Sequence, residues 1–98
     1  MKPLTARQIS LRLNSVPLWS HRGSAIRRRF EFPGFPASIA FVRRVAVKAE
    51  KAKHHPDIDI RWNKVALTLT THSEGGLTEK DFSMAQECDQ VAARHFKL

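Results

Sequence analysis

Between residues 26 and 32, apolar and charged side chains alternate, and this pattern constrains the fold more than any other feature of the chain. One face holds Ile26, Phe30 and Phe32, whereas the opposite face holds only charged residues. A period of two residues is typical of a β-strand with one face buried and the other in water. The pattern therefore predicts a sheet that is covered on one side only. Arg28 is the exception on the apolar face, and we expect it at a sheet edge, where its head group reaches solvent.

Other segments have strand-like patterns too. Residues 18–22 precede the turn residues Gly23-Ser24 and should pair with residues 26–32 as a hairpin. Residues 58–62 alternate isoleucine or tryptophan with charged residues, and residues 65–72 alternate again after a short break at Asn63-Lys64. These patterns predict a second hairpin and therefore four antiparallel strands.

Helical spacing marks the rest of the chain. A capping-box spacing that begins at Thr5 predicts a short helix over about residues 6–14. Apolar residues recur at three- and four-residue intervals from Pro36 to about Lys53, which predicts the main helix, and Pro56 prevents it from continuing. A second capping-box spacing at Thr78 predicts that the last helix begins there.

The elements therefore follow the order helix, two strands, helix, two strands, helix. This order predicts the α+β class, specifically a two-layer sandwich in which a four-stranded antiparallel sheet carries helices on one face. A chain of 98 residues is close to the commonest domain size, so we expect a single domain over residues 1–98.

Composition narrows the class of partner rather than the fold. The net charge of +8 favours anionic partners, but the basic runs 27–29 and 43–44 have no interleaved aromatic residues, so we do not expect nucleic-acid binding. No run of 18 apolar residues and no apolar N-terminal segment occurs, so we expect a cytoplasmic protein that does not bind membranes. The lone Cys88 excludes an intramolecular disulfide, and its place within the last helix predicts a buried, unreactive thiol.

Histidines lie at the ends of two predicted elements. His54 and His55 fall where the main helix meets Pro56, and His72 falls at the end of the last strand, so these ends can face each other across a shallow cleft. Imidazole suits proton transfer because its ordinary pKa, about 6.5, is near neutral pH. Glu50 lies four residues before His54, so we expect it to fix the tautomer of that ring.

Two other interpretations of these residues stay open. Three histidines and a carboxylate can bind zinc, but adjacent histidines would have to splay apart and no familiar ligand spacing occurs, so we expect no metal. The histidines can also be polar ends of elements in a non-catalytic interaction module, which would use the basic surface to bind an acidic partner.

The histidine segment is part of a longer pattern that resembles the signature of the pterin-4a-carbinolamine dehydratases. Seven positions carry it: Glu50, His54, His55, Pro56, Trp62, His72 and Asp81. Smaller similarities lie at Trp19, in residues 26–32, in Asn63-Lys64-Val65, in Thr71-His72 and in Gly76-Leu77-Thr78. The resemblance covers nearly the whole chain.

The resemblance implies a 4a-hydroxytetrahydrobiopterin dehydratase, a hydro-lyase that needs no metal and no cofactor. Such an enzyme removes water from the pterin-4a-carbinolamine to give quinonoid dihydropterin in tetrahydrobiopterin recycling. The family roles transfer to His54 and His72 as general acid and base, to His55 as a binding and orienting group, and to Glu50 as a group that tunes them. The implied substrate-contacting residues are Lys53, His54, His55, Thr70, Thr71, His72 and Ser73.

Three points within the resemblance stay open: the role of Trp19, the effect of two departures from the family pattern, and the identity of the pterin. Trp19 is either a wall of the pocket or a packed hairpin residue. Lys53 and Ser73 depart from the family, where acidic residues are common in the animal enzymes. Another pterin is an alternative substrate, such as one in molybdenum-cofactor metabolism.

The resemblance also implies partners. Homodimers or homotetramers are expected, and an aromatic amino acid hydroxylase is a candidate pathway partner. Some relatives serve as dimerisation partners of a homeodomain transcription factor, which makes a transcriptional cofactor module the alternative function. No residue of this chain transfers that role.

Overall fold

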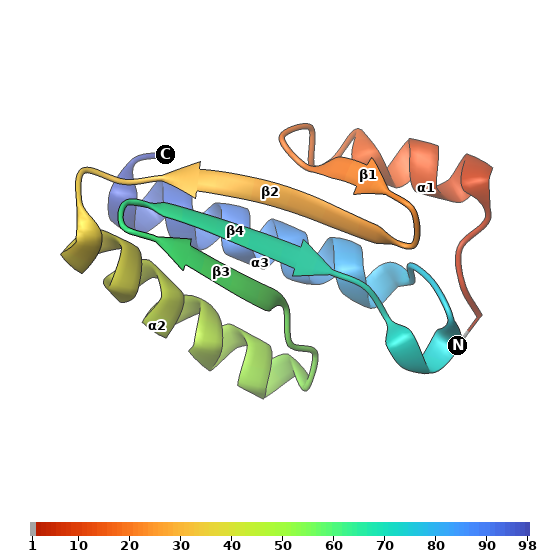
Figure 1. Ribbon diagram of the computed structural model, residues 1–98. Helices are drawn as coiled ribbons and strands as arrows, with labels where there is room; N and C mark the ends of the chain where they lie inside the picture. The colour runs from red at the N-terminus through yellow and green to blue at the C-terminus, as the bar shows by residue number, and fades with distance from the viewer. Residues whose placement is uncertain (1) are drawn as a thin grey trace.

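A computed structural model describes residues 2–98, and within them a four-stranded antiparallel sheet is packed against helices (Figure 1). The elements are α1 (Ala6–Leu13), β1 (Ser20–Arg22), β2 (Ala25–Glu31), α2 (Phe35–Ala52), β3 (Asp57–Arg61), β4 (Lys64–Leu69), the short 3-10 helix η1 (His72–Glu74) and α3 (Glu79–Phe96). The strand order is β1-β2-β4-β3. Figure 1 shows α3 behind β2 and β4, with no element in front of these strands. The predicted two-layer α+β class is confirmed. Among the described helices, none has the length and apolar character that a membrane crossing requires.

The core lies between the sheet and the helices, as the two periodicities predict. The inward residues of β4 are fully buried: Val65, Leu67 and Leu69. From α2, the ring of Phe41 reaches the sheet, and its centroid lies 4.7 Å from that of Phe30 and 5.0 Å from that of Phe32. These rings hold α2 against β2 and the segment that follows it.

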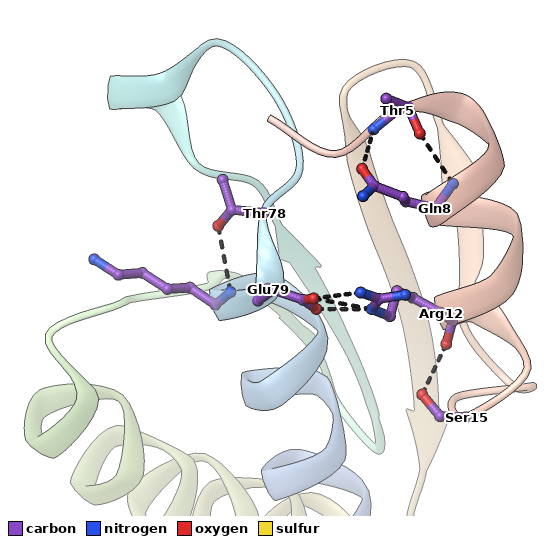
Figure 2. A network of polar contacts seen from close by, with 7 residues as sticks. Thr5, Gln8, Arg12, Ser15, Thr78 and Glu79 are labelled. Carbon is purple, nitrogen blue, oxygen red and sulfur yellow. Dashed lines mark hydrogen bonds and ion pairs between the residues drawn. The ribbon is translucent and has the colours of Figure 1, made fainter. Parts of the chain in front are cut away.

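The short helix α1 is capped at its first turn and linked to α3 near its other end. The predicted capping box is present, because the Thr5 hydroxyl accepts from the Gln8 backbone N–H and the Gln8 side chain accepts from the Thr5 N–H. Near its other end, Arg12 makes a forked ion pair with Glu79 in the first turn of α3, with Nε at 2.9 and 3.0 Å from the two carboxylate oxygens (Figure 2). This hydrogen bonding lowers the pKa of Glu79. The pair therefore holds α1 beside the start of α3.

The expected edge position of Arg28 is wrong, because β2 lies between β1 and β4 in the sheet. The guanidinium instead reaches α3, where Nη1 lies 2.6 Å from Oδ1 of Asp89, and its carbon lies 4.0 Å from the ring centroid of Phe30. The indole of Trp19 donates to the same Oδ1 at 2.9 Å. Arg28 is thus neutralised inside the molecule rather than exposed at an edge.

Three predicted ends of helices or strands differ from the observed ones. Each difference places a residue of the family signature outside the element in which it was predicted. Helix α2 ends at Ala52 because Lys53 takes a left-handed conformation (φ 53°), so His54 lies beyond the helix and not on its last turn. Trp62 lies in the β3–β4 turn with φ 54° rather than in the strand. Strand β4 ends at Leu69, which places His72 at the start of η1 and not at the strand end.

Candidate active site

A buried carboxylate, Asp81, joins the two loops that carry the predicted histidines. Its Oδ1 accepts a hydrogen bond from Nε2 of His54 at 2.6 Å. Its Oδ2 accepts from the Thr71 hydroxyl at 2.8 Å and from the backbone N–H of Thr78 at 2.9 Å. Because His54 follows α2 and Thr71 follows β4, one carboxylate holds the two loops next to each other.

The position of Asp81 follows from the way α3 begins. Asp81 is the third residue of that helix, and it completes the capping box predicted at Thr78. The cap uses Oδ2, while the Thr71 and Thr78 hydroxyls lie 2.9 Å apart beside it. The sequence predicts Asp81 as a helix cap and as a signature position, but not its bond to His54. One signal in the sequence could have predicted this bond. A carboxylate that caps a helix uses only one of its oxygens, so the other oxygen of Asp81 can accept from a second partner.

The bond to Asp81 determines the tautomer of His54 when the carboxylate is ionised. An ionised carboxylate only accepts hydrogen bonds, so Nε2 of His54 is the donor. The other ring nitrogen, Nδ1, has no hydrogen-bond partner within residues 2–98. The ring also lines a hollow of about 370 Å³ between the end of α2 and the first turns of α3. The other lining residues are Ala52, Glu79, Lys80, Ser83, Met84 and Glu87.

The expected pairing of Glu50 with His54 is wrong. Oε1 of Glu50 lies 2.9 Å from Nε2 of His55 instead. The i,i+4 argument requires both residues to be helical, and the left-handed Lys53 ends the helix before His54. Both partners of the observed pair are largely exposed, so the pair contributes little to stability.

The remaining predicted residues lie on the same two loops. His72 is exposed at the start of η1, and its ring has no hydrogen-bond partner among the described residues. Lys53 and Ser73 are also exposed. The Thr70 hydroxyl donates to the backbone oxygen of Ser24 at 2.5 Å, which fixes the end of β4 against the β1–β2 turn.

Trp19 is a packed hairpin residue rather than a wall of the hollow that His54 lines. Its side chain is 4% exposed, and its ring meets that of Phe30 edge-on at a centroid distance of 6.2 Å. With its indole nitrogen bonded to Asp89, it belongs to the core beneath β1.

The remaining candidate chemistries are a metal site and a cysteine nucleophile. Within residues 2–98, no group of three or more histidine, cysteine or acidic side chains is arranged to hold a metal ion. Cys88 is fully buried, as predicted, and this burial raises the pKa of its thiol to about 12. A thiol in that state is not a nucleophile at neutral pH.

Fold and site together define a class: a two-layer α+β domain in which a capping carboxylate holds a histidine between two loops. The family model for pterin 4 alpha carbinolamine dehydratase matches residues 2–91. The chain is 52% identical to a protein of Roseiflexus sp. (strain RS-1) over 90% of this chain and 95% of that protein. It is 54% identical to a protein of Acidobacterium capsulatum over 93% and 99% of the two chains. Both relatives are provisionally named pterin-4-alpha-carbinolamine dehydratases.

Two solved structures that resemble this chain are also described as a pterin dehydratase or as pterin dehydratase-like. The crystal structure of a transcriptional coactivator/pterin dehydratase from Brucella melitensis matches with a TM-score of 0.89 and 35% identity, covering 93% of this chain and 99% of that chain. A pterin dehydratase-like protein described as a RuBisCO assembly factor in the alpha-carboxysome matches with a TM-score of 0.65 and 26% identity, covering 76% and 88%. This chain belongs to the pterin 4 alpha carbinolamine dehydratase family.

Proposed function

We propose that this protein dehydrates 4a-hydroxytetrahydropterins by histidine acid–base catalysis. One observation carries the proposal: the buried Asp81 holds Nε2 of His54 at 2.6 Å, which leaves Nδ1 for the substrate. A buried carboxylate that orients an imidazole is the arrangement that fixes a tautomer for proton transfer. The family membership supplies the pterin as the substrate class.

The reaction requires two proton transfers at neighbouring atoms. The hydroxyl on carbon 4a must be protonated so that it leaves as water, and the bond from carbon to oxygen breaks as the lone pair of nitrogen 5 forms a double bond to carbon 4a. Nitrogen 5 then loses its proton, which gives quinonoid dihydropterin. A general acid and a general base are sufficient for this sequence, and each transfer is typically worth about 10²–10⁴-fold in rate.

We assign these two transfers to His54 and His72, which lie on the loops that Asp81 joins. His72 is exposed and its ring has no partner within the described part of the chain, so it is free to meet a substrate. His55, which Glu50 holds at 2.9 Å, would orient the pterin from the same loop as His54. The pterin ring would lie against residues 53–55 and 70–73.

The physiological setting belongs to the same proposal. We propose that the enzyme works in tetrahydrobiopterin recycling beside an aromatic amino acid hydroxylase, as a cytoplasmic homo-oligomer and as a single domain. Lys53 and Ser73 border the proposed site and would influence which pterin side chain is accepted. Comparing 4a-hydroxytetrahydropterins with different side chains at position 6 measures that preference.

The test is a stopped-flow assay that follows the decay of 4a-hydroxytetrahydropterin. We expect His54→Ala and His72→Ala each to lower kcat by about 10²–10⁴-fold. The matched control is His95→Ala, an exposed histidine 14 residues beyond Asp81 on α3 and therefore about 21 Å away along the helix. It should keep wild-type turnover. Because His72 makes no contact that holds the fold, its variant tests the site even if His54→Ala unfolds; wild-type turnover in both variants would overturn the proposal.

A further inference from the structure

The face of the sheet turned away from the helices has a basic half made by β1 and β2. Arg22 on β1 and Arg27 and Arg29 on β2 are exposed on this face. None of the three guanidinium groups pairs with a carboxylate within residues 2–98. We call these residues the arginine row. By contrast, Arg28 points to the other face, where Asp89 neutralises it.

The arginine row lines two adjoining hollows. The first has a volume of about 290 Å³ and is lined by Leu18, Ser20, Arg22, Arg27, Arg28 and Arg29. The second has about 210 Å³ and is lined by Arg27, Arg29, Asp59, Arg61, Lys64 and Ala66. Both hollows share Arg27 and Arg29, and small residues lie opposite these two on β4: Thr68 opposite Arg27, and Ala66 opposite Arg29. The small side chains leave space at the centre of the face.

The far side of the same face carries charges of both signs. On the edge strand β3, Asp57 lies across from Thr68 and Asp59 lies across from Ala66. Asp59 is engaged by Arg61, whose Nε lies 3.3 Å away, whereas the arginine row has no such partner. The β1–β2 half, where the guanidinium groups are unpaired, therefore attracts an anionic chain more strongly than the β3 side does.

We propose that the arginine row binds the phosphate backbone of a single-stranded nucleic acid, without base specificity. Guanidinium groups match phosphate oxygens with two parallel hydrogen bonds. Arg27 and Arg29 are two residues apart on one strand, which sets their Cα atoms about 6.6–6.8 Å apart and presents them as a regular row. Such a row fits a chain of phosphates that runs along β2 as far as Arg29; Glu31, the next residue on this face, lies across from Lys64 of β4.

Exposed apolar side chains lie in or next to the segments that line the two hollows, which favours a nucleic acid over other polyanions. Leu18, which lines the first hollow, is 66% exposed. Trp62 is 65% exposed in the β3–β4 turn, between Arg61 and Lys64, which line the second hollow. Unpaired bases stack on such aromatic rings beside a positively charged groove. The sequence argued against this role because no aromatic residue interrupts the basic runs, but folding places Trp62 in the turn between Arg61 and Lys64, which line the second hollow together with Arg27 and Arg29.

The experiment measures fluorescence anisotropy of a labelled 12-nucleotide oligo(dT) with the full chain between 50 and 200 mM KCl. Three neutralised phosphates predict a slope of about −2 for log affinity against log salt, which is a loss of about 20-fold over that range. The test variant is the triple substitution Arg22→Ala, Arg27→Ala, Arg29→Ala. The matched control, Arg7→Ala, Arg43→Ala, Arg94→Ala, removes the same charge from exposed helix positions.

We expect the test variant to lose at least tenfold in affinity at 50 mM KCl and the control to lose less than about twofold. Trp62→Ala should weaken binding about tenfold, because one base loses its stacking partner. Equal losses in both triple variants would show that only net charge matters and would overturn the proposal. Poly-glutamate that displaces the oligonucleotide at equal charge concentration would overturn it as well, in favour of an acidic protein partner. Thermal unfolding of each variant confirms that it is folded.

Discussion

Replacing Asp81 with asparagine separates the charge of this side chain from its role as a helix cap. Oδ2 accepts from the backbone N–H of Thr78, which can only donate, so the amide oxygen of an asparagine must take the Oδ2 position. The amide nitrogen then takes the Oδ1 position, 2.6 Å from Nε2 of His54. Two donors cannot share this contact, so His54 must move its proton from Nε2 to Nδ1.

The consequence for catalysis is much larger than the consequence for stability. We expect kcat/KM to fall by about 10²–10⁴-fold, because the same exchange in a serine-protease triad lowers kcat by about 10⁴-fold through the wrong tautomer. Both hydrogen bonds to Oδ2 of Asp81 remain, and only the charge-assisted bond to His54 weakens. The free energy of unfolding should therefore fall by only about 1–3 kcal/mol.

Three measurements test this reasoning. Stopped-flow decay of 4a-hydroxytetrahydropterin gives kcat/KM, urea titration gives the free energy of unfolding, and ¹⁵N NMR of the imidazole nitrogens gives the tautomer of His54. The control is Asp59→Asn, which removes an exposed carboxylate on β3 and should leave kcat/KM unchanged. If Asp81→Asn moved the proton to Nδ1 and kept wild-type kcat/KM, the tautomer of His54 would not matter for the reaction. An unmoved proton would instead refute the hydrogen-bond argument.

Two further predictions concern the core. Phe41→Ala removes a fully buried ring between Phe30 and Phe32, so the free energy of unfolding in urea should fall by about 3–5 kcal/mol, and a loss below about 1 kcal/mol would contradict this packing. Burial, together with the Asp89 carboxylate, raises the pKa of Cys88 from 9.0 to about 12, so a thiol reagent should label it at about pH 8 only in urea. Because the folded pKa is the higher one, the stability that this thiol contributes is complete below about pH 9 and is lost as the pH rises toward 12. Cys88→Ala should lose less stability over that range.

The fold class could be predicted because the patterns that determine it are local. Alternation along residues 26–32 defines a strand with one buried face, and the capping boxes at Thr5 and Thr78 mark where two helices begin. Each of these signals is contained in fewer than ten residues. The position of Arg28 could not be predicted this way, because its partner Asp89 is 61 residues away on another element.

The site was predictable only in part, because its decisive contact joins residues that are far apart in the sequence. The resemblance supplied the identities of the histidines, but the i,i+4 argument paired Glu50 with His54, and that pairing depends on a helix that continues to His54. Lys53 adopts a left-handed conformation that nothing in the local pattern requires, and it turns the chain out of α2. The true partner of His54 is Asp81, which is 27 residues further along the chain.

Asp81 makes the start of α3 and the candidate proton-transfer group one structural unit. Its Oδ2 is committed to the helix cap and to Thr71, so Oδ1 has one available direction, and His54 must meet it there. A carboxylate placed on a flexible loop would leave the imidazole free to rotate and to take either tautomer. A carboxylate fixed by a helix cap does not, because moving Oδ1 would break the cap bond to Thr78 and leave a buried donor unsatisfied. The stability of the fold therefore enforces the orientation on which the proposed acid–base chemistry depends.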